Sequence, residues 1–237
     1  MGAAQIVEYS GRAMAPHSTQ FLYEERHWLK YDSGSLAERV VLYTCQSGQP
    51  FARKTVVYRD PVAPDFLFED RSNGMREGVR FEAGQRRMFF KANDREAERA
   101  AALPVIEGLV ADAGFDEFVQ LHWDSLLRGE PAYFPFLVPS RLESMNFQLT
   151  HLKRAERDGS ESFRLKLTGV MGLVAPGIDV TYSADSRLLK VYEGLSDLRD
   201  ASGENLHADI RFDPKDRHES SAERMHSASV VALQACR

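Results

Sequence analysis

The sequence predicts an α+β protein made mostly of antiparallel strands, a curved open barrel, or half-barrel, of about 11–12 strands that wraps one central helix. Three observations lead to this fold class. One amphipathic stretch lies near the middle of the chain, turn dipeptides punctuate the sequence before it, and apolar residues alternate with polar ones after it. A two-sheet sandwich is the alternative arrangement. We expect a single β-rich domain over residues 1–213 and a polar, partly frayed tail over residues 214–237, with a short terminal element at Val230, Val231 and Leu233 as the alternative.

The amphipathic stretch lies within Leu109–Leu142 and predicts a helix near residues 112–128. Apolar residues and one histidine recur there at helical spacing and define a core-facing stripe: Phe115, Phe118, Val119, His122 and Leu126, widened by Trp123 and Leu127. Asp112 is the expected N-cap, and Arg128 followed by Gly129 supplies the stop signal. This helix is expected to plug the concave side of the sheet.

Before the helix, turn dipeptides separate segments rich in β-branched and aromatic residues. The strongest turn signal is Asn73-Gly74, because tight hairpins need the positive φ that glycine tolerates. The predicted strands are Gln20–Tyr31, Glu38–Cys45, Phe51–Arg59, Asp65–Asp70, Met75–Glu82 and Arg86–Lys91. The alanine-rich segment Asn93–Leu103 is expected to form a helical turn or two that ends before Pro104.

After the helix, the alternation becomes cleaner and predicts strands with one wet face. Phe147 and Leu149 alternate with polar residues, as do Phe163, Leu165 and Leu167, and Asp158-Gly159 is expected to join these two segments as a hairpin. The alternation continues through Val180–Tyr182, Leu189–Val191 and Leu206–Phe212.

Composition and charge limit the classes of function. The formal charge of −5 argues against a dedicated nucleic-acid-binding protein, which needs a basic surface to neutralise phosphates. The longest apolar runs fall short of the ~18 residues of a spanning helix, so the chain is not expected to span a membrane.

The cysteines and the first residues bear on location. Cys45 and Cys236 lack metal-ligand spacing, and we expect two unpaired thiols rather than a single disulfide. Residues 1–5, MGAAQ, are typical of a start methionine placed before a mature terminus whose signal peptide has been removed. This favours the periplasm or cell envelope, with the cytoplasm as the alternative.

The sequence carries no motif that names a reaction, and we assign no catalytic residue, metal site or cofactor. Gly194-Leu195-Ser196 lacks the second glycine of a nucleophile elbow. Four carboxyl groups are candidates for acid–base work, but nothing in the sequence brings two of them together: Asp70, Glu77, Asp112 and Asp116.

The strongest candidate for a binding site is the proline-punctuated aromatic segment at the helix exit. The candidate ligand-binding residues are Trp123, Tyr133, Phe134, Phe136 and Arg141. Apolar pockets with a few polar groups form at such places in curved sheets. The alternative interpretation is that the aromatic residues fill the core and that Arg141 forms a structural ion pair.

Several segments resemble an uncharacterised family of conserved hypothetical proteins of proteobacteria. The resemblance covers about Ile6 to Asp213, and its motifs are VADAGFDEFVQLHWDSLLRGE with FPFLVPSRL, PFARKTVVY, PDFLFEDR and VYEGLSDLRDASG. At the level of the fold, the layout is similar to the half-barrels of periplasmic lipoprotein carriers and sensors of the LolA, LolB and RseB type. That similarity implies an apolar ligand, a lipid or the acyl chain of a lipoprotein.

The function expected from the sequence is therefore an envelope protein that holds an apolar ligand or acyl chain in a half-barrel groove. Two alternatives stay open: a cavity-free module that binds a protein partner, and a hydrolase-type enzyme.

Overall fold

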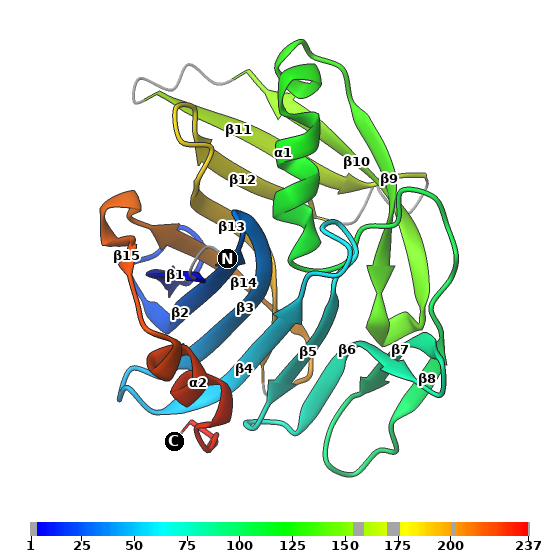
Figure 1. Ribbon diagram of the computed structural model, residues 1–237, viewed down its shortest axis with the longest axis vertical. Coiled ribbons are helices and arrows are strands. Elements are labelled where there is room, and N and C mark those ends of the chain that lie inside the picture. The colour runs from blue at the N-terminus through cyan, green and yellow to red at the C-terminus, as the bar shows by residue number, and fades with distance from the viewer. Residues whose placement is uncertain (1–3, 154–158, 170–175, 201, 237) are drawn as a thin grey trace.

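A computed structural model describes residues 4–153, 159–169, 176–200 and 202–236. It confirms the predicted fold class: mostly antiparallel strands form one curved, open sheet, with two α-helices packed against it (Figure 1). Within these residues, no helix is both long enough and apolar enough to cross a membrane. The expected Asp158-Gly159 hairpin lies partly outside the described residues.

The strands are longer and more numerous than the sequence indicates. The first eight are β1 Gln5–Met14, β2 Phe21–Asp32, β3 Ser35–Thr44, β4 Pro50–Val57, β5 Asp65–Asp70, β6 Met75–Glu82, β7 Gln85–Lys91 and β8 Arg99–Ala102. The others are β9 Ala132–Val138, β10 Glu143–Leu152, β11 Ser160–Leu167, β12 Ile178–Ser183, β13 Leu189–Arg199, β14 Asn205–Phe212 and β15 His218–Glu219.

The sheet has two meanders joined at the first and the fourteenth strand. The order is β8-β7-β6-β5-β4-β3-β2-β1-β14-β13-β12-β11-β10-β9, and β15 adds to β1. The outer strands β8 and β9 are not paired with each other, but the segment after β8 approaches β9. Val110 N–H donates to Pro135 O, and Leu137 N–H donates to Val110 O, both at 2.9 Å. The open side of the barrel is therefore spanned by a loop rather than by a regular ladder.

Helix α1, Gly114–Leu127, lies on the inner side of β9–β12 (Figure 1). The predicted stripe is confirmed in its core: Phe118, Val119 and Leu126 are buried, together with Trp123. Gly129 has a φ of 87° and ends the helix as predicted. The N-cap prediction is wrong, because the cap position is Ala113 and its side chain makes no capping bond.

The start of α1 packs closely against the loop between β4 and β5. A Cβ atom on Gly114 would lie 2.1 Å from Val62 O and 2.8 Å from Pro64 Cδ. Only glycine fits at this contact, and Ala111 N–H donates to the same Val62 carbonyl at 2.9 Å. The helix is thereby fixed to the opposite half of the sheet at its N-terminal end.

The helical turn expected over Asn93–Leu103 is wrong, because Arg99–Ala102 forms β8. Its residues pair with β7, for example Ala101 with Met88 and Ala100 with Phe89. Alanine is the strongest helix former, but the energy per residue is small, and the backbone hydrogen bonds offered by the unpaired edge of β7 outweigh it.

The C-terminal segment is folded, which corrects the expectation of a frayed tail. It forms β15 and helix α2, Ala222–Val230, whose Met225 and Ala228 pack against Ile6, Trp28 and Val40 on the outer face of the sheet. Cys45 and Cys236 form a disulfide with a Cα–Cα distance of 6.0 Å, which corrects the expectation of two free thiols. Since 191 residues separate them in sequence, their spacing gave no indication of the pairing.

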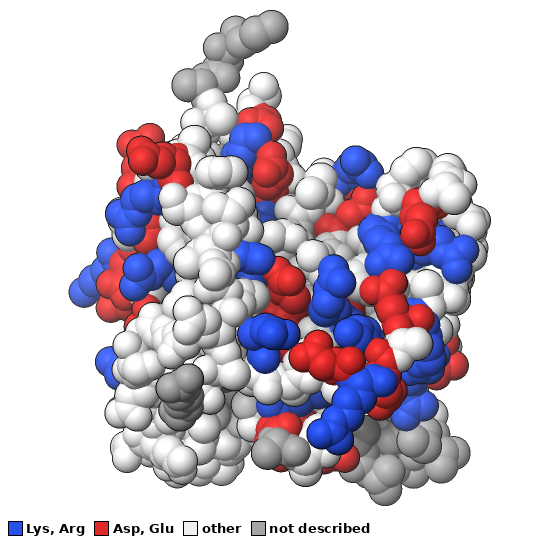
Figure 2. All heavy atoms as spheres, turned by 90° about the horizontal axis from the view of Figure 1, so that it is seen from below, with Lys and Arg blue, Asp and Glu red and all other residues white. Residues whose placement is uncertain are grey.

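The surface seen from below carries charges of both signs side by side, next to a broad uncharged area (Figure 2). Charged side chains of the molecule form ion pairs at the surface, such as Arg80 with Glu98 at 2.7 Å. This face carries no large region of a single sign.

Candidate functional site

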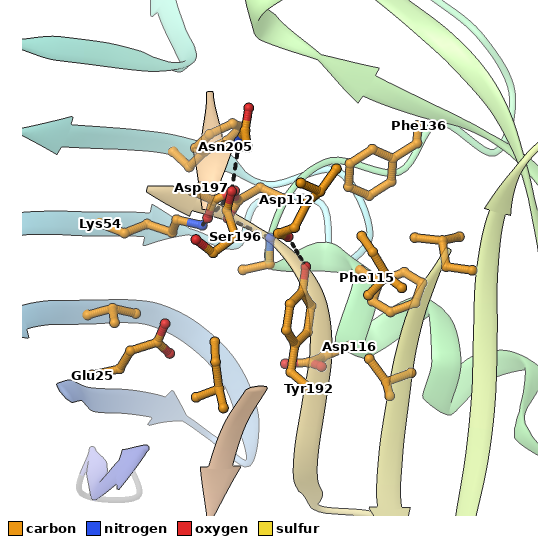
Figure 3. A pocket seen from close by; sticks show the side chains of 18 of the residues that line it. Glu25, Lys54, Asp112, Phe115, Asp116, Phe136, Tyr192, Ser196, Asp197 and Asn205 are labelled. Atoms are coloured by element: carbon orange, nitrogen blue, oxygen red, sulfur yellow. Dashed lines mark hydrogen bonds and ion pairs between the residues drawn. The ribbon is translucent and has the colours of Figure 1, made fainter. Parts of the chain in front are cut away.

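A cavity of about 400 Å³ lies between the inner face of the sheet, the start of α1 and β9. Its size falls in the range of small-molecule sites. Its walls differ in character (Figure 3): charged side chains from β2, β4 and β13 lie on one side, and Phe115 of α1 and Phe136 of β9 lie on the other.

The charged wall is built from inward-facing positions of the first meander. Along β2, Glu25 and His27 lie at the alternate, buried positions between Tyr23 and Leu29. Across the sheet, Lys54 pairs with Phe68 and Phe68 pairs with Glu77. Residues directly opposite in antiparallel strands point to the same face, so Lys54 and Glu77 both point inward, on either side of the Phe68 ring.

Lys54 is the centre of this wall. Its Nζ donates to Asp112 Oδ2 at 2.6 Å and to Asp197 Oδ2 at 2.5 Å (Figure 3). Burial alone lowers the pKa of Lys54, but the two carboxylates outweigh that effect and hold the pKa well above its ordinary value. Lys54 is therefore a fixed positive charge, unsuited to act as a neutral nucleophile.

Two glutamates on this wall titrate near neutral pH. Burial raises the pKa of Glu25 to about 7, against the opposing charge of Lys54. Burial, reinforced by the charges of Asp197 and Asp112, raises the pKa of Glu77 to about 8. Glu25 Oε2 lies 3.0 Å from His27 Nε2, whereas Glu77 has no hydrogen-bond or ion-pair partner among the residues that the structure describes.

A second, partly buried ion pair connects α1 to the sheet. Arg39 of β3 donates to Asp116 Oδ2 at 3.2 Å and to the Tyr9 hydroxyl at 2.6 Å, and the Tyr182 hydroxyl of β12 donates to Asp116 Oδ1 at 3.0 Å. Asp116 is thus bonded to both meanders. This network holds the helix beside the cavity and occupies the Arg39 charge.

An irregularity in β13 directs Ser196 and Asp197 to the cavity. The register with β14 shifts between Leu195 and Arg199, and Asn205 Nδ2 donates to Ser196 O at 2.7 Å. Such bulges re-aim side chains near functional sites. Ser196 is 9% exposed, and its hydroxyl has no hydrogen-bond partner of normal geometry within the described part of the chain.

The apolar wall comes from α1 and the second meander. It contains partly buried side chains that pack against the core around α1 while lining the cavity: Phe115, Phe136, Phe147, Ile178 and Leu189. Because these side chains keep some accessible surface, an apolar ligand would remove additional apolar area from water.

Of the ligand-binding residues proposed from the sequence, Phe136 lines the cavity. Trp123 and Phe134 are buried in the core around α1. Tyr133 is 67% exposed and accepts a hydrogen bond from Gln148 Nε2. Arg141 lies at the surface, 3.7 Å from Glu143. These four do not line the cavity.

The structure brings together three of the four carboxyl groups that the sequence left apart. Glu77, Asp112 and Asp116 line the cavity, whereas Asp70 accepts hydrogen bonds from Ser72 and Asn73 in the β5–β6 turn. Glu25, Lys54 and Asp197 were missed. The signal that identifies Glu25, Lys54 and Glu77 is a charged residue at an inward position of an alternating strand, for example Lys54 between Ala52 and Val56.

Comparison with known proteins adds no assignment. No protein-family model, no curated protein and no solved structure matches the chain.

Proposed function

We propose that this protein binds a small amphipathic or apolar molecule, such as a lipid or an acyl chain, in the cavity between α1, β9 and the inner face of the sheet. The observation that carries the proposal is the cavity itself, which is about 400 Å³ in volume and combines an aromatic and aliphatic wall with a charged one. Binding sites for small molecules commonly have this composition.

The cavity disfavours the two alternatives. A cavity-free interaction module would have filled this space with side chains. A hydrolase would need an activated nucleophile, but Lys54 is held charged by two aspartates, and the Ser196 hydroxyl is not hydrogen-bonded to a base within the described residues.

We further propose that the protein works in the periplasm or cell envelope. The Cys45–Cys236 disulfide supports this location, since disulfides persist mainly in oxidising compartments and are rare in reducing ones. Thiol alkylation of the protein in intact cells tests the location, and a fully reduced pair in vivo would contradict it.

Binding is tested with protein purified from its own host. Native mass spectrometry and solvent extraction should find a bound apolar molecule, and the stripped protein should bind 1-decanol in calorimetric titration. Ile178→Trp should weaken decanol binding by about tenfold or more, because the indole would occupy part of the cavity against its apolar wall. The matched control is Val57→Trp, which changes a half-exposed residue outside the cavity. No extracted molecule together with no decanol binding would refute the proposal.

A further inference from the structure

The charges that line the cavity are unequal. Five carboxyl groups face it, from Glu25, Glu77, Asp112, Asp116 and Asp197, against three permanent cations, Arg39, Lys54 and Arg199. With all groups ionised, the cavity carries an excess of negative charge. It is balanced when two of the carboxyl groups are protonated, or when one is protonated and a monovalent cation enters.

Two of the three cations, Lys54 and Arg39, are paired with carboxylates, whereas Arg199 contacts a backbone carbonyl and an aromatic ring. Lys54 is bonded to Asp112 and Asp197, and Arg39 is bonded to Asp116. Arg199 Nη1 donates to Gly203 O at 2.9 Å, and its guanidinium lies 5.4 Å from the centre of the Phe90 ring. The buried Nε atoms of Arg39 and Arg199 have no hydrogen-bond partner within the described residues. An anionic group entering the cavity would nevertheless meet more carboxyl groups than cations, with Lys54 and Arg39 already paired to carboxylates, which is electrostatically unfavourable.

Glu77 is the cavity carboxyl group that has no hydrogen-bond or ion-pair partner within the described residues. It lies in register between Phe68 and Phe90, whose rings flank it on the inner face of the sheet. Aromatic faces attract cations, and Lys54 and Arg199 already lie over these same two rings, at 5.6 and 5.4 Å.

An independent observation also points to a missing ligand in this cavity. Ser196 lines the cavity next to Asp197 in the sequence and is nine-tenths buried; its hydroxyl lies beside that of Tyr23 but makes no hydrogen bond of normal geometry within the described residues. A buried hydroxyl is normally satisfied, and its lone pairs can accept from an N–H donor.

We propose that the cavity selects a cationic amphiphile, a molecule with an apolar body against Phe115 and Phe136 and a protonated amine against the Glu77 carboxylate. This inference rests on the proposed function and names the ligand class. The groups that face Glu77 are the carboxylates Asp112 and Asp197 and the cations Lys54 and Arg199. The ammonium takes the place of the proton that Glu77 otherwise keeps up to a pKa of about 8.

The test uses three probes with the same ten-carbon chain: decylamine, 1-decanol and decanoate. Calorimetric titration of the full-length protein at pH 9 should give decylamine an affinity about tenfold or more above that of decanol, with decanoate weakest. At pH 6 the preference for the amine should shrink, because Glu77 then holds a proton that must be displaced. Below its pKa, amine binding should release protons, measurable as a dependence of the binding heat on the buffer.

Glu77→Gln should abolish the preference of amine over decanol and its pH dependence. Glu107→Gln, at an exposed loop position outside the cavity, should leave both unchanged. Decanol or decanoate binding as tightly as decylamine at pH 9, or a preference that persists in Glu77→Gln, would overturn the inference while leaving the proposed function standing. If none of the three probes binds, the proposed function fails and this inference fails with it.

Discussion

Lys54 shows how much of the site depends on one buried charge. Its side chain is 10% exposed and that of Asp112 is 7% exposed, and 2.6 Å separates Nζ from Oδ2. Removal of one partner from a buried ion pair leaves the other charge uncompensated, which costs more than the pair itself contributes.

Lys54→Met should therefore lower the free energy of unfolding by about 3–5 kcal/mol at neutral pH. Asp112→Asn in the same background should recover part of the loss, because the uncompensated carboxylate is then removed. Urea denaturation of the wild type, the two single variants and the double variant gives a double-mutant cycle that measures the interaction between Lys54 and Asp112. Equal stability of Lys54→Met and the wild type would show that the pair is not buried as described.

Glu77 gives stability a characteristic dependence on pH. Its folded pKa of about 8 lies above its ordinary value of 4.5, so the folded protein binds this proton more tightly than the unfolded chain does. The contribution of Glu77 is therefore fully present below pH 4.5 and is lost as the pH rises toward 8.

We expect the free energy of unfolding to fall between pH 5 and pH 8, and Glu77→Gln to reduce that fall by up to several kcal/mol, since the amide carries no charge at any pH. Urea denaturation at unit pH steps measures the difference between the variant and the wild type. Glu107→Gln is the control for loss of a carboxyl group. Parallel pH profiles for Glu77→Gln and the wild type would contradict the burial of this carboxyl.

At the scale of elements, the contact between α1 and the β4–β5 loop holds the two halves of the sheet around the cavity. Gly114→Ala would place a Cβ atom 2.1 Å from Val62 O. The backbone would have to shift, and overpacking of this kind costs about 1–3 kcal/mol. The helix start, and Asp112 just before it, would move with the backbone.

Thermal denaturation of Gly114→Ala should show a lower midpoint, and the affinity for decanol should fall as well. Ser125→Ala, in the same helix and away from the cavity, serves as the control. A Gly114→Ala variant with wild-type stability would show that the β4–β5 loop moves to accommodate the added methyl group without loss of stability.

Elements were predictable to the extent that their pattern was local. The stripe of α1 and the limits of β5 and β6 follow from periodicity and turn residues, because each depends on neighbours in sequence. The strand β8 was not predictable, since its alanines pair only because β7 presents a free edge. Cavity residues such as Glu25 and Asp197 come from distant strands, and only the register of the sheet brings them together.

At the scale of the molecule, the sheet is open and the chain secures it at two places. The segment at Val110 connects β9 to the loop after β4, through the bonds of Val110 to β9 and of Ala111 to Val62. The C-terminal segment covers the outer face: Glu8 of β1 accepts hydrogen bonds from Trp28, Ser220 and Arg224 at 2.7–2.9 Å. The disulfide then fixes the end of the chain to the end of β3.

That disulfide closes a loop of 191 residues, so its effect on the unfolded chain should be large. The chain-entropy relation gives ~5 kcal/mol for a loop of this length, and measured values are commonly lower. The double variant Cys45→Ser/Cys236→Ser should therefore have a lower midpoint of urea denaturation than the wild type. Relative to the wild type, hydrogen exchange should speed up more at the amides of α2 than at those of β1–β4. The control is the wild type under reducing conditions, which should behave like the double variant. Unchanged exchange in α2 would show that Glu8 and the contacts of Met225 hold the helix without the disulfide.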